Sequence, residues 1–179
     1  MLGLMGTGKT SVGTALAAML GWTFRDSDAE ILASTGKTAR DIAAEGGSEA
    51  IHREEARHLL GALEAGEQSV IGAAASVIEN PACRDSLNER ALVVWLKASV
   101  DTLVARFEVG GHRPLYGDSV EAMFRRQMIA RDRLFEATAD ATIDVDAGTN
   151  GTTPTPPQLA LLIVERLGLQ LRGSDNAAT

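Results

Sequence analysis

Apolar positions along this chain follow two periods, and the changes between them predict its secondary structure. Short apolar runs predict buried strands at residues 22–24, 69–72, 91–96 and 141–145. Between these runs, apolar residues recur every three or four positions, as on one face of a helix. This period predicts helices near residues 9–20, 29–32, 38–43, 49–62, 81–87, 99–107, 120–135 and 159–167. Strands that alternate with helices predict a parallel sheet with helices on both faces, which is a three-layer α/β fold.

The composition is that of an ordinary globular domain. Of the 179 residues, 45% are hydrophobic and 23% are charged, and a chain of this length can bury a proper core. We expect one domain over residues 1–172 and a small, polar, disordered tail at residues 173–179. The single cysteine, Cys83, excludes an internal disulfide bond.

Charge and hydropathy restrict the partners. A net charge of −7 and a pI near 5.0 argue against non-specific binding to nucleic acid or to an anionic membrane. The sequence shows no pattern of a signal peptide or membrane-spanning helix, so we expect a cytoplasmic protein. The expected partner is a small molecule, and the expected state is a monomer.

The most specific local pattern is Gly-Leu-Met-Gly-Thr-Gly-Lys-Thr at residues 3–10, which fits the phosphate-binding loop G-x-x-x-x-G-K-[ST]. Its glycines let backbone N–H groups approach phosphate oxygens, and the helix that begins there attracts anions. Lys9 would reach the β- and γ-phosphates of a nucleotide, and the Thr10 hydroxyl would ligate Mg²⁺. The simpler alternative is a glycine-rich turn before an ordinary helix. The other residues expected to bind the nucleotide are Gly6, Thr7, Gly8 and Ser11.

The start of the chain is unusual for such a loop. A phosphate-binding loop normally follows a buried parallel strand of about five apolar residues, and here only Met1 and Leu2 precede Gly3. The strand is therefore either a stub or truncated. We favour truncation, and expect the natural product to begin upstream with an apolar strand.

Two carboxylates follow the next strand of the chain. Asp26 and Asp28 come directly after residues 22–24. The carboxyl end of a strand in an open α/β sheet is the edge where ligands bind, so these aspartates are candidates for the reaction site. A solvated turn is the simpler interpretation.

Two arginines in the second half of the chain are further candidates. Arg113 lies in residues 108–118, whose glycines and proline predict an exposed, mobile loop. Arg131 lies in the long helix that follows. The simpler interpretations are an ordinary loop charge for Arg113 and a helix-face ion pair with Asp132 or Glu136 for Arg131.

Taken together, and with no GTPase-type N-K-x-D motif, these features resemble the shikimate kinase family over nearly the whole chain. The residues that carry the resemblance are Gly3 to Thr10, Asp26-Ser27-Asp28, Thr35-Gly36-Lys37, Glu54-Glu55, Arg113-Pro114-Leu115 and Arg131. The resemblance implies a P-loop fold of nucleoside-monophosphate-kinase type. It also implies an enzyme that moves the γ-phosphate of ATP to a hydroxyl of a small metabolite, with Mg²⁺.

The resemblance also implies a role for each candidate. Thr10 would bind Mg²⁺ directly, and Asp26 would hold it through water. Asp28 would contact the acceptor hydroxyl and act as its base. Arg113, on a lid at residues 108–118, would meet the ATP phosphates, and Arg131 would bind an anionic group of the acceptor. With Lys9, Asp28 and Arg113 form the implied catalytic set, and phosphoryl transfer does depend mainly on such alignment and charge neutralisation.

Three features of the sequence depart from the family pattern. A Gly-Gly-Gly run of the family is Ala73-Ala74-Ala75 here, and the added methyl groups would crowd the approach of the backbone to the acceptor. An arginine that grips the carboxylate of shikimate corresponds, in ungapped register, to Ile51. The nucleotide-base loop, at residues 147–157, has no basic residue. The donor half of the site therefore looks intact, and the acceptor half looks altered.

These patterns leave several hypotheses open. The main one is a Mg²⁺- and ATP-dependent kinase of shikimate kinase type with an acceptor other than shikimate. The alternatives are an authentic shikimate kinase, a nucleotide-binding protein without kinase turnover, and a nucleotide kinase of the same fold.

Overall fold

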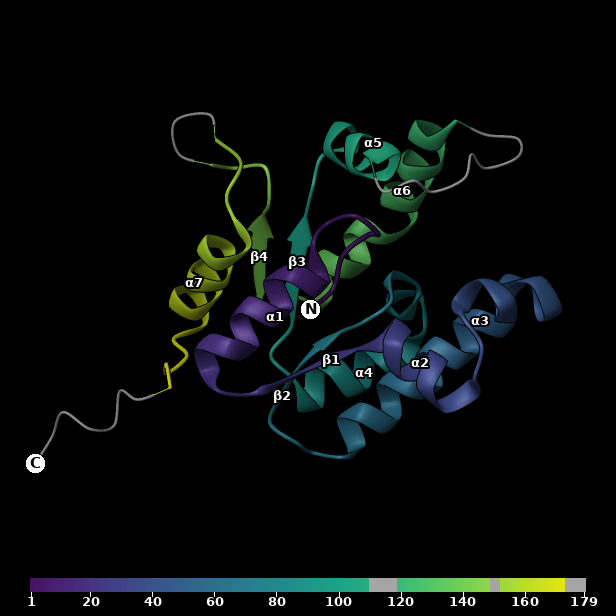
Figure 1. The fold of residues 1–179 in the computed structure, drawn as a ribbon, viewed down its shortest axis with the longest axis horizontal. Helices are drawn as coiled ribbons and strands as arrows, with labels where there is room; N and C mark the ends of the chain where they lie inside the picture. The colour runs from purple at the N-terminus through teal and green to yellow at the C-terminus, as the bar shows by residue number, and fades with distance from the viewer. Residues whose placement is uncertain (110–118, 149–151, 173–179) are drawn as a thin grey trace, which may run out of the picture.

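The computed structural model describes residues 1–109, 119–148 and 152–172. The described strands are β1 (Thr23–Asp26), β2 (Ser69–Gly72), β3 (Val94–Lys97) and β4 (Ala141–Asp144). The helices are α1 (Lys9–Leu20), α2 (Ser27–Thr35), α3 (Ala39–Glu64), the 3-10 helix η1 (Ala75–Glu79), α4 (Pro81–Arg90), α5 (Val100–Val109), α6 (Val120–Thr138) and α7 (Pro156–Leu167). Strands and helices alternate along most of the chain, as the apolar periods predict (Figure 1).

The strands form two parallel pairs that the first two residues connect. Strand β1 pairs with β2, and β3 pairs with β4. Leu2 exchanges backbone hydrogen bonds with Val94 and Leu96 of β3 at 2.7 and 2.9 Å. On its other side, the Met1 carbonyl accepts from Ala73 N–H, just after β2, at 3.1 Å. Met1 and Leu2 therefore occupy the central position of the sheet, and the strand expected before the phosphate-binding loop is a stub within this chain.

A cavity of about 310 Å³ lies beside this stub. Its lining includes Met1, Val70 and Val94, with Leu59, Leu87 and Ile163 from the surrounding helices. The terminal ammonium of Met1 donates to Ile71 O at 2.8 Å. Burial, together with repulsion from Lys9, lowers the pKa of this ammonium from 8.0 to about 5. The cavity thus separates β2 from β3 except where Met1 and Leu2 join them.

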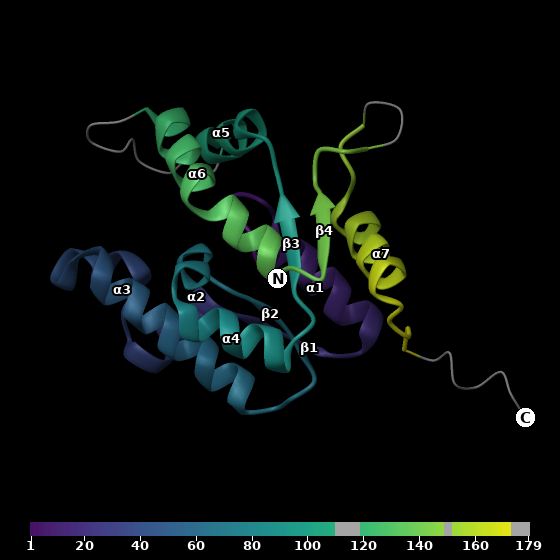
Figure 2. The same cartoon turned by 180° about the vertical axis from the view of Figure 1, so that it is seen from behind.

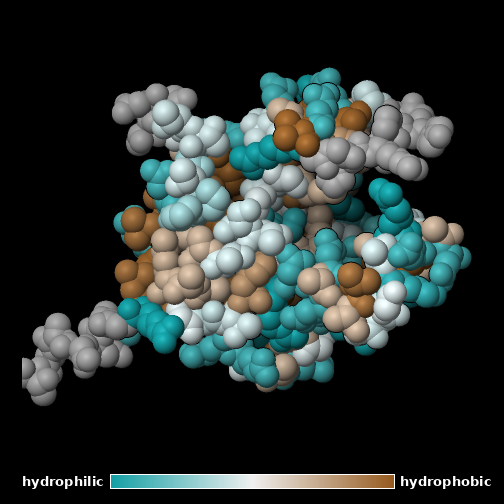
Figure 3. Space-filling view, viewed as in Figure 1, coloured by the Kyte–Doolittle hydropathy of each residue, from teal (hydrophilic) through white to brown (hydrophobic). Residues whose placement is uncertain are grey.

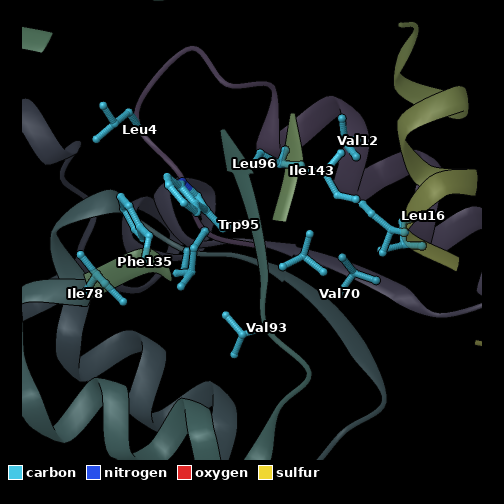
Figure 4. Packing of buried hydrophobic residues seen from close by; sticks show 14 of the residues in the cluster. Leu4, Val12, Leu16, Val70, Ile78, Val93, Trp95, Leu96, Phe135 and Ile143 are labelled. Carbon is cyan, nitrogen blue, oxygen red and sulfur yellow. The ribbon is translucent and has the colours of Figure 1, made fainter. Parts of the chain in front are cut away.

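Helices cover the strands from both sides. In Figure 1, α1 lies in front of β3 and α7 lies beside β4, and Figure 2 shows α4 and α6 on the opposite side. The core between these layers includes Leu96 and Ile143 on adjacent strands (Figure 4). The rings of Trp95 and Phe135 stack at 5.7 Å between centroids. This packing confirms the three-layer α/β fold and fixes the strand ends on which the site is built.

The sequence places several element boundaries a few residues away from their actual positions. Strand β3 begins at Val94 rather than at residue 91, and β1 extends to Asp26. The helices expected at residues 38–43 and 49–62 form the single element α3. Gly47 adopts φ 75° inside α3 and kinks it, and a glycine can do so because it has no Cβ. The Gly46-Gly47 pair, which the sequence suggests is a turn, is therefore a kink in a longer helix.

Among the described residues, no helix combines the length and the apolar character needed to cross a membrane. The lid expected at residues 108–118 and the tail expected at 173–179 lie almost entirely outside the described residues.

Candidate active site

The phosphate-binding loop joins the stub to helix α1. Gly6 and Gly8 have φ values of 86° and 94°, which residues with a Cβ rarely adopt. Gly3 has φ 141°, and a Cβ there would lie 2.5 Å from the Leu96 carbonyl oxygen. The loop is thus pressed against β3 and turns back into α1 at Gly8, which is the N-cap of that helix. A phosphate held here would face the positive end of the helix dipole.

The side chain of Lys9 folds over this loop. Its Nζ donates to the carbonyl oxygens of Gly3 and Leu4 at 2.9 and 3.2 Å. Burial lowers the Lys9 pKa from 10.5 to about 8, although Asp28, Asp26 and Glu55 act in the opposite direction. Lys9 is therefore partly buried. Three carboxylates therefore act electrostatically on the Lys9 ammonium.

Thr10 and Asp26 form the oxygen pair expected of a Mg²⁺ site. Thr10 Oγ1 donates to Asp26 Oδ2 at 2.8 Å, and Asp26 also caps α2 by accepting from Asp28 N–H at 3.1 Å. In the described parts of the chain, no three His, Cys, Asp or Glu side chains form a group that could hold a metal. One hydroxyl and one or two carboxylates fit Mg²⁺, which prefers oxygen ligands and usually takes the rest from phosphates and water.

Asp28 lies in the first turn of α2, beside Asp26. Burial and the neighbouring Asp26 charge raise the pKa of Asp28, and Lys9 opposes this shift. A carboxylate with a raised pKa is a better proton acceptor, and remains ionised at neutral pH unless the shift is large. This position and charge suit a base for an acceptor hydroxyl.

Of the other loop residues, Thr7 and Ser11 differ in exposure. Thr7 is buried, and its hydroxyl donates to Leu4 O at 2.9 Å, so its side chain braces the loop. Ser11 is exposed in the first turn of α1. Sequence reasoning missed Arg106, whose Nη1 donates to Gly6 O at 2.8 Å from helix α5. Only the tertiary packing of α5 on the loop reveals this arginine, because the sequence shows it simply as one charge on an amphipathic helix.

Glu55 marks the acceptor side of the site. Ser76 Oγ, at the start of η1, donates to Glu55 Oε2. Burial raises the Glu55 pKa, and the carboxyl group also senses His52, Asp28 and Arg131. Helix α3, helix η1, the start of α2 and helix α6 thus converge near this carboxyl group. In Figure 3, a recess on the molecular face separates the α2–α3 end from the α5–α6 end.

Arg131, on helix α6, forms an ion pair with a carboxylate of helix η1. Its Nε donates to Glu79 Oε1 at 2.6 Å, and its Nη1 donates to Gln127 Oε1 at 3.3 Å. The ion pair anticipated with Asp132 or Glu136 is therefore replaced by a pair with Glu79, which lies 52 residues away in the chain.

Two of the features that depart from the family pattern lie close to Glu55. Ile51 precedes it by about one helical turn, and the run Ala73-Ala74-Ala75 leads into Ser76, which donates to Glu55. Ile51 is only 7% exposed and belongs to the core, whereas His52 is exposed one turn before Glu55. Ala73 is 3% exposed, and Ala74 has an ordinary φ of −61°. The alanine run thus adopts a backbone that does not require glycine. Arg113, the lid arginine, lies outside the described residues.

The comparisons with known proteins agree with this geometry. A family model described as shikimate kinase matches residues 5–166. A shikimate kinase of Caulobacter vibrioides is 36% identical over 150 residues, which cover 83% of this chain and 72% of the relative. One from Paramagnetospirillum magneticum is 32% identical over 169 residues, with coverage of 93% and 82%.

Solved structures show the same likeness. A structure titled shikimate kinase from Acinetobacter baumannii in complex with shikimate superposes with a TM-score of 0.80 at 29% identity. The match covers 93% of this chain and 89% of that one. The shikimate kinase of Bacteroides thetaiotaomicron has a TM-score of 0.82 at 24% identity, and this likeness supports the fold.

Proposed function

Because the chain belongs to the shikimate kinase family and is an ATP-dependent small-molecule kinase of that type, we propose that it phosphorylates a hydroxylated metabolite for which shikimate is a poor substitute. The observation that carries the catalytic part is the Thr10–Asp26 contact at 2.8 Å at the mouth of the phosphate-binding loop. Beside it stand Lys9 and Asp28, so a nucleotide phosphate and an acceptor hydroxyl can meet there.

On the donor side, the loop N–H groups and Lys9 bind the phosphates of ATP. Arg106 holds the loop through Gly6 O. Thr10 and Asp26 would hold Mg²⁺, and the ion would neutralise charge on the transferred phosphoryl group. Arg113, which lies outside the described residues, is the proposed further contact to the ATP phosphates on the donor side.

On the acceptor side, Asp28 accepts the proton of the attacking hydroxyl. The raised pKa of Asp28 favours this role. Arg131 orients the acceptor from helix α6. Ile51 is buried in the core and supplies no cation to the acceptor, and we expect the methyl groups of the alanine run to narrow the pocket. Both changes favour a smaller or less acidic acceptor over shikimate, because a charge-assisted contact contributes about 1.5–3 kcal/mol.

The test is an ATP-consumption screen against hydroxylated metabolites, with shikimate included, followed by mutation of the base. We expect Asp28→Asn to reduce kcat on the best acceptor by at least about 100-fold, in line with the usual contribution of a general base. ATP binding should be retained. Asp85→Asn, on the exposed surface of α4, is the matched control and should keep full activity. Full turnover by Asp28→Asn would remove Asp28 from the mechanism.

Two alternatives have distinct outcomes in the same screen. Efficient turnover of shikimate would identify an authentic shikimate kinase. Binding of ATP without turnover of any acceptor would indicate a nucleotide-binding protein. The retained Asp28 and Arg131 favour catalysis over this second alternative, because a nucleotide-binding protein would not need residues on the acceptor side.

A further inference from the structure

The guanidinium of Arg131 already has a carboxylate partner. Nε donates to Glu79 at 2.6 Å, and Nη1 donates to Gln127 at 3.3 Å. The Arg131 side chain is only 12% exposed, whereas the Glu79 side chain is 43% exposed. Glu79 therefore reaches inward from the end of η1 to an arginine that is nearly buried.

This pairing limits how a ligand carboxylate could bind. A carboxylate binds a guanidinium best through two parallel N–H donors. The two edges of the group that offer such a pair are Nε with Nη2 and Nη1 with Nη2. Glu79 occupies the first edge, and Gln127 engages one nitrogen of the second. A carboxylate acceptor would thus have to displace Glu79 or share the donors with Gln127.

The surrounding charges also oppose an anion. Ser76, at the start of η1, donates to Glu55, and Glu79, at the end of η1, accepts from Arg131. The charges of Asp28 and Arg131 also act on the Glu55 carboxyl group. Neighbouring carboxylates repel one another, and they also repel an added anion. Among these residues, Arg131 offers a permanent cation to the acceptor, and Glu79 largely neutralises it.

We propose that Glu79 determines acceptor selectivity: by holding the anion-binding edge of Arg131, it makes the site prefer an uncharged hydroxylated molecule over a carboxylate such as shikimate. This inference rests on the proposed kinase function. Glu79 acts through Arg131, so it is a positioning residue rather than a catalytic one. It differs from the changes at Ile51 and the alanine run because it adds a negative charge that substitution can remove.

The experiment compares two ligands that differ in a single charge, shikimate and its uncharged methyl ester. Calorimetric titration measures the affinity of each in the presence of Mg²⁺ and a non-hydrolysable ATP analogue. The variant is Glu79→Gln, which keeps the shape of the side chain. The matched control is Glu121→Gln, which removes a glutamate paired with Arg125 at 2.7 Å on the exposed face of helix α6, the helix that carries Arg131.

The quantity compared is the ratio of the two affinities, because general damage to the pocket affects both ligands alike. The wild-type protein should bind the ester at least as well as shikimate. Glu79→Gln should shift the ratio toward shikimate by about tenfold, the effect of freeing Arg131 from one partly exposed charge pair. Glu121→Gln should leave the ratio unchanged.

Three results would overturn the proposal: an equal ratio in wild type and Glu79→Gln, a wild-type preference for shikimate, or no binding of either ligand to either protein. Glu79→Ala provides the same comparison if Glu79→Gln melts at a lower temperature. Titration of the ATP analogue separates the two claims. If the analogue fails to bind the wild-type protein, the kinase assignment itself fails, whereas an unchanged ratio with normal nucleotide binding refutes only the role of Glu79.

Discussion

At the scale of single residues, Lys9 shows how burial sets the chemistry of one charge. Lys9→Ala should weaken binding of Mg²⁺-ATP by about 10- to 100-fold, because one charge-assisted contact to phosphate is lost. The fold should survive, since the side chain bonds only to carbonyl groups of its own loop. Calorimetric titration measures the loss. Lys37→Ala is the control, because Lys37 pairs with Glu45 on the surface and its removal should not change ATP affinity.

The lowered pKa of Lys9 adds a pH signature to the same measurement. The Lys9 pKa is about 8 in the free protein, so the charged fraction falls as the pH rises through this value. Phosphate binds the charged form. ATP affinity should therefore be full well below pH 8 and decline as the pH rises through 8, with uptake of a proton on binding in this range. An affinity that stays constant from pH 7 to 9.5, or a full-strength Lys9→Ala variant, would contradict the role of Lys9.

At the scale of elements, the space between β2 and β3 is the least complete part of the fold. In a parallel strand, alternate residues direct their backbone N–H and C=O groups to the same side. The carbonyl groups of Ile71 and Val94 accept from Met1 and Leu2. The peptide groups of Ile71 and Val94 therefore face the cavity between the strands. An extended apolar segment joined to Met1 would lie between the two strands. It would replace the buried ammonium with a peptide group and fill apolar space.

An engineered extension tests this account of the cavity. Adding about five apolar, β-branched residues before Met1 should raise the melting temperature by at least about 5 °C, since each buried side chain contributes about 1.5–3 kcal/mol. An extension of equal length made of glycine and serine is the control, because it removes the terminal charge but supplies no apolar side chain. Equal melting temperatures for the two extended proteins would show that the cavity is not a strand site.

The elements differ in how far sequence could reveal them. The phosphate-binding loop, Asp26 and Asp28 are predictable because short local patterns set their geometry. The Arg106–Gly6 and Arg131–Glu79 contacts join residues 100 and 52 positions apart, and only helix packing brings them together. The kink at Gly47 escaped prediction for a related reason: the helix continues beyond a glycine pair that usually marks a turn. Local chemistry was thus predictable, and the partners of each charge were not.

At the scale of the whole molecule, two halves of one site differ in character. The donor half combines the loop, Lys9, Thr10 and Asp26 at the carboxyl ends of parallel strands. The acceptor half combines Asp28 with helices α3, η1 and α6, and we propose that its charges and shape disfavour shikimate. This arrangement predicts a kinase with retained ATP chemistry and a changed acceptor.

The most direct test is steady-state kinetics with shikimate at saturating Mg²⁺-ATP. The altered acceptor half predicts a kcat/KM well below about 10⁴ M⁻¹s⁻¹, the lower end of the usual range for enzymes with their own substrates. Binding of ATP, measured on the same preparation, should be normal. A kcat/KM for shikimate within about 10⁴–10⁸ M⁻¹s⁻¹ would contradict the account and identify the protein as an ordinary shikimate kinase.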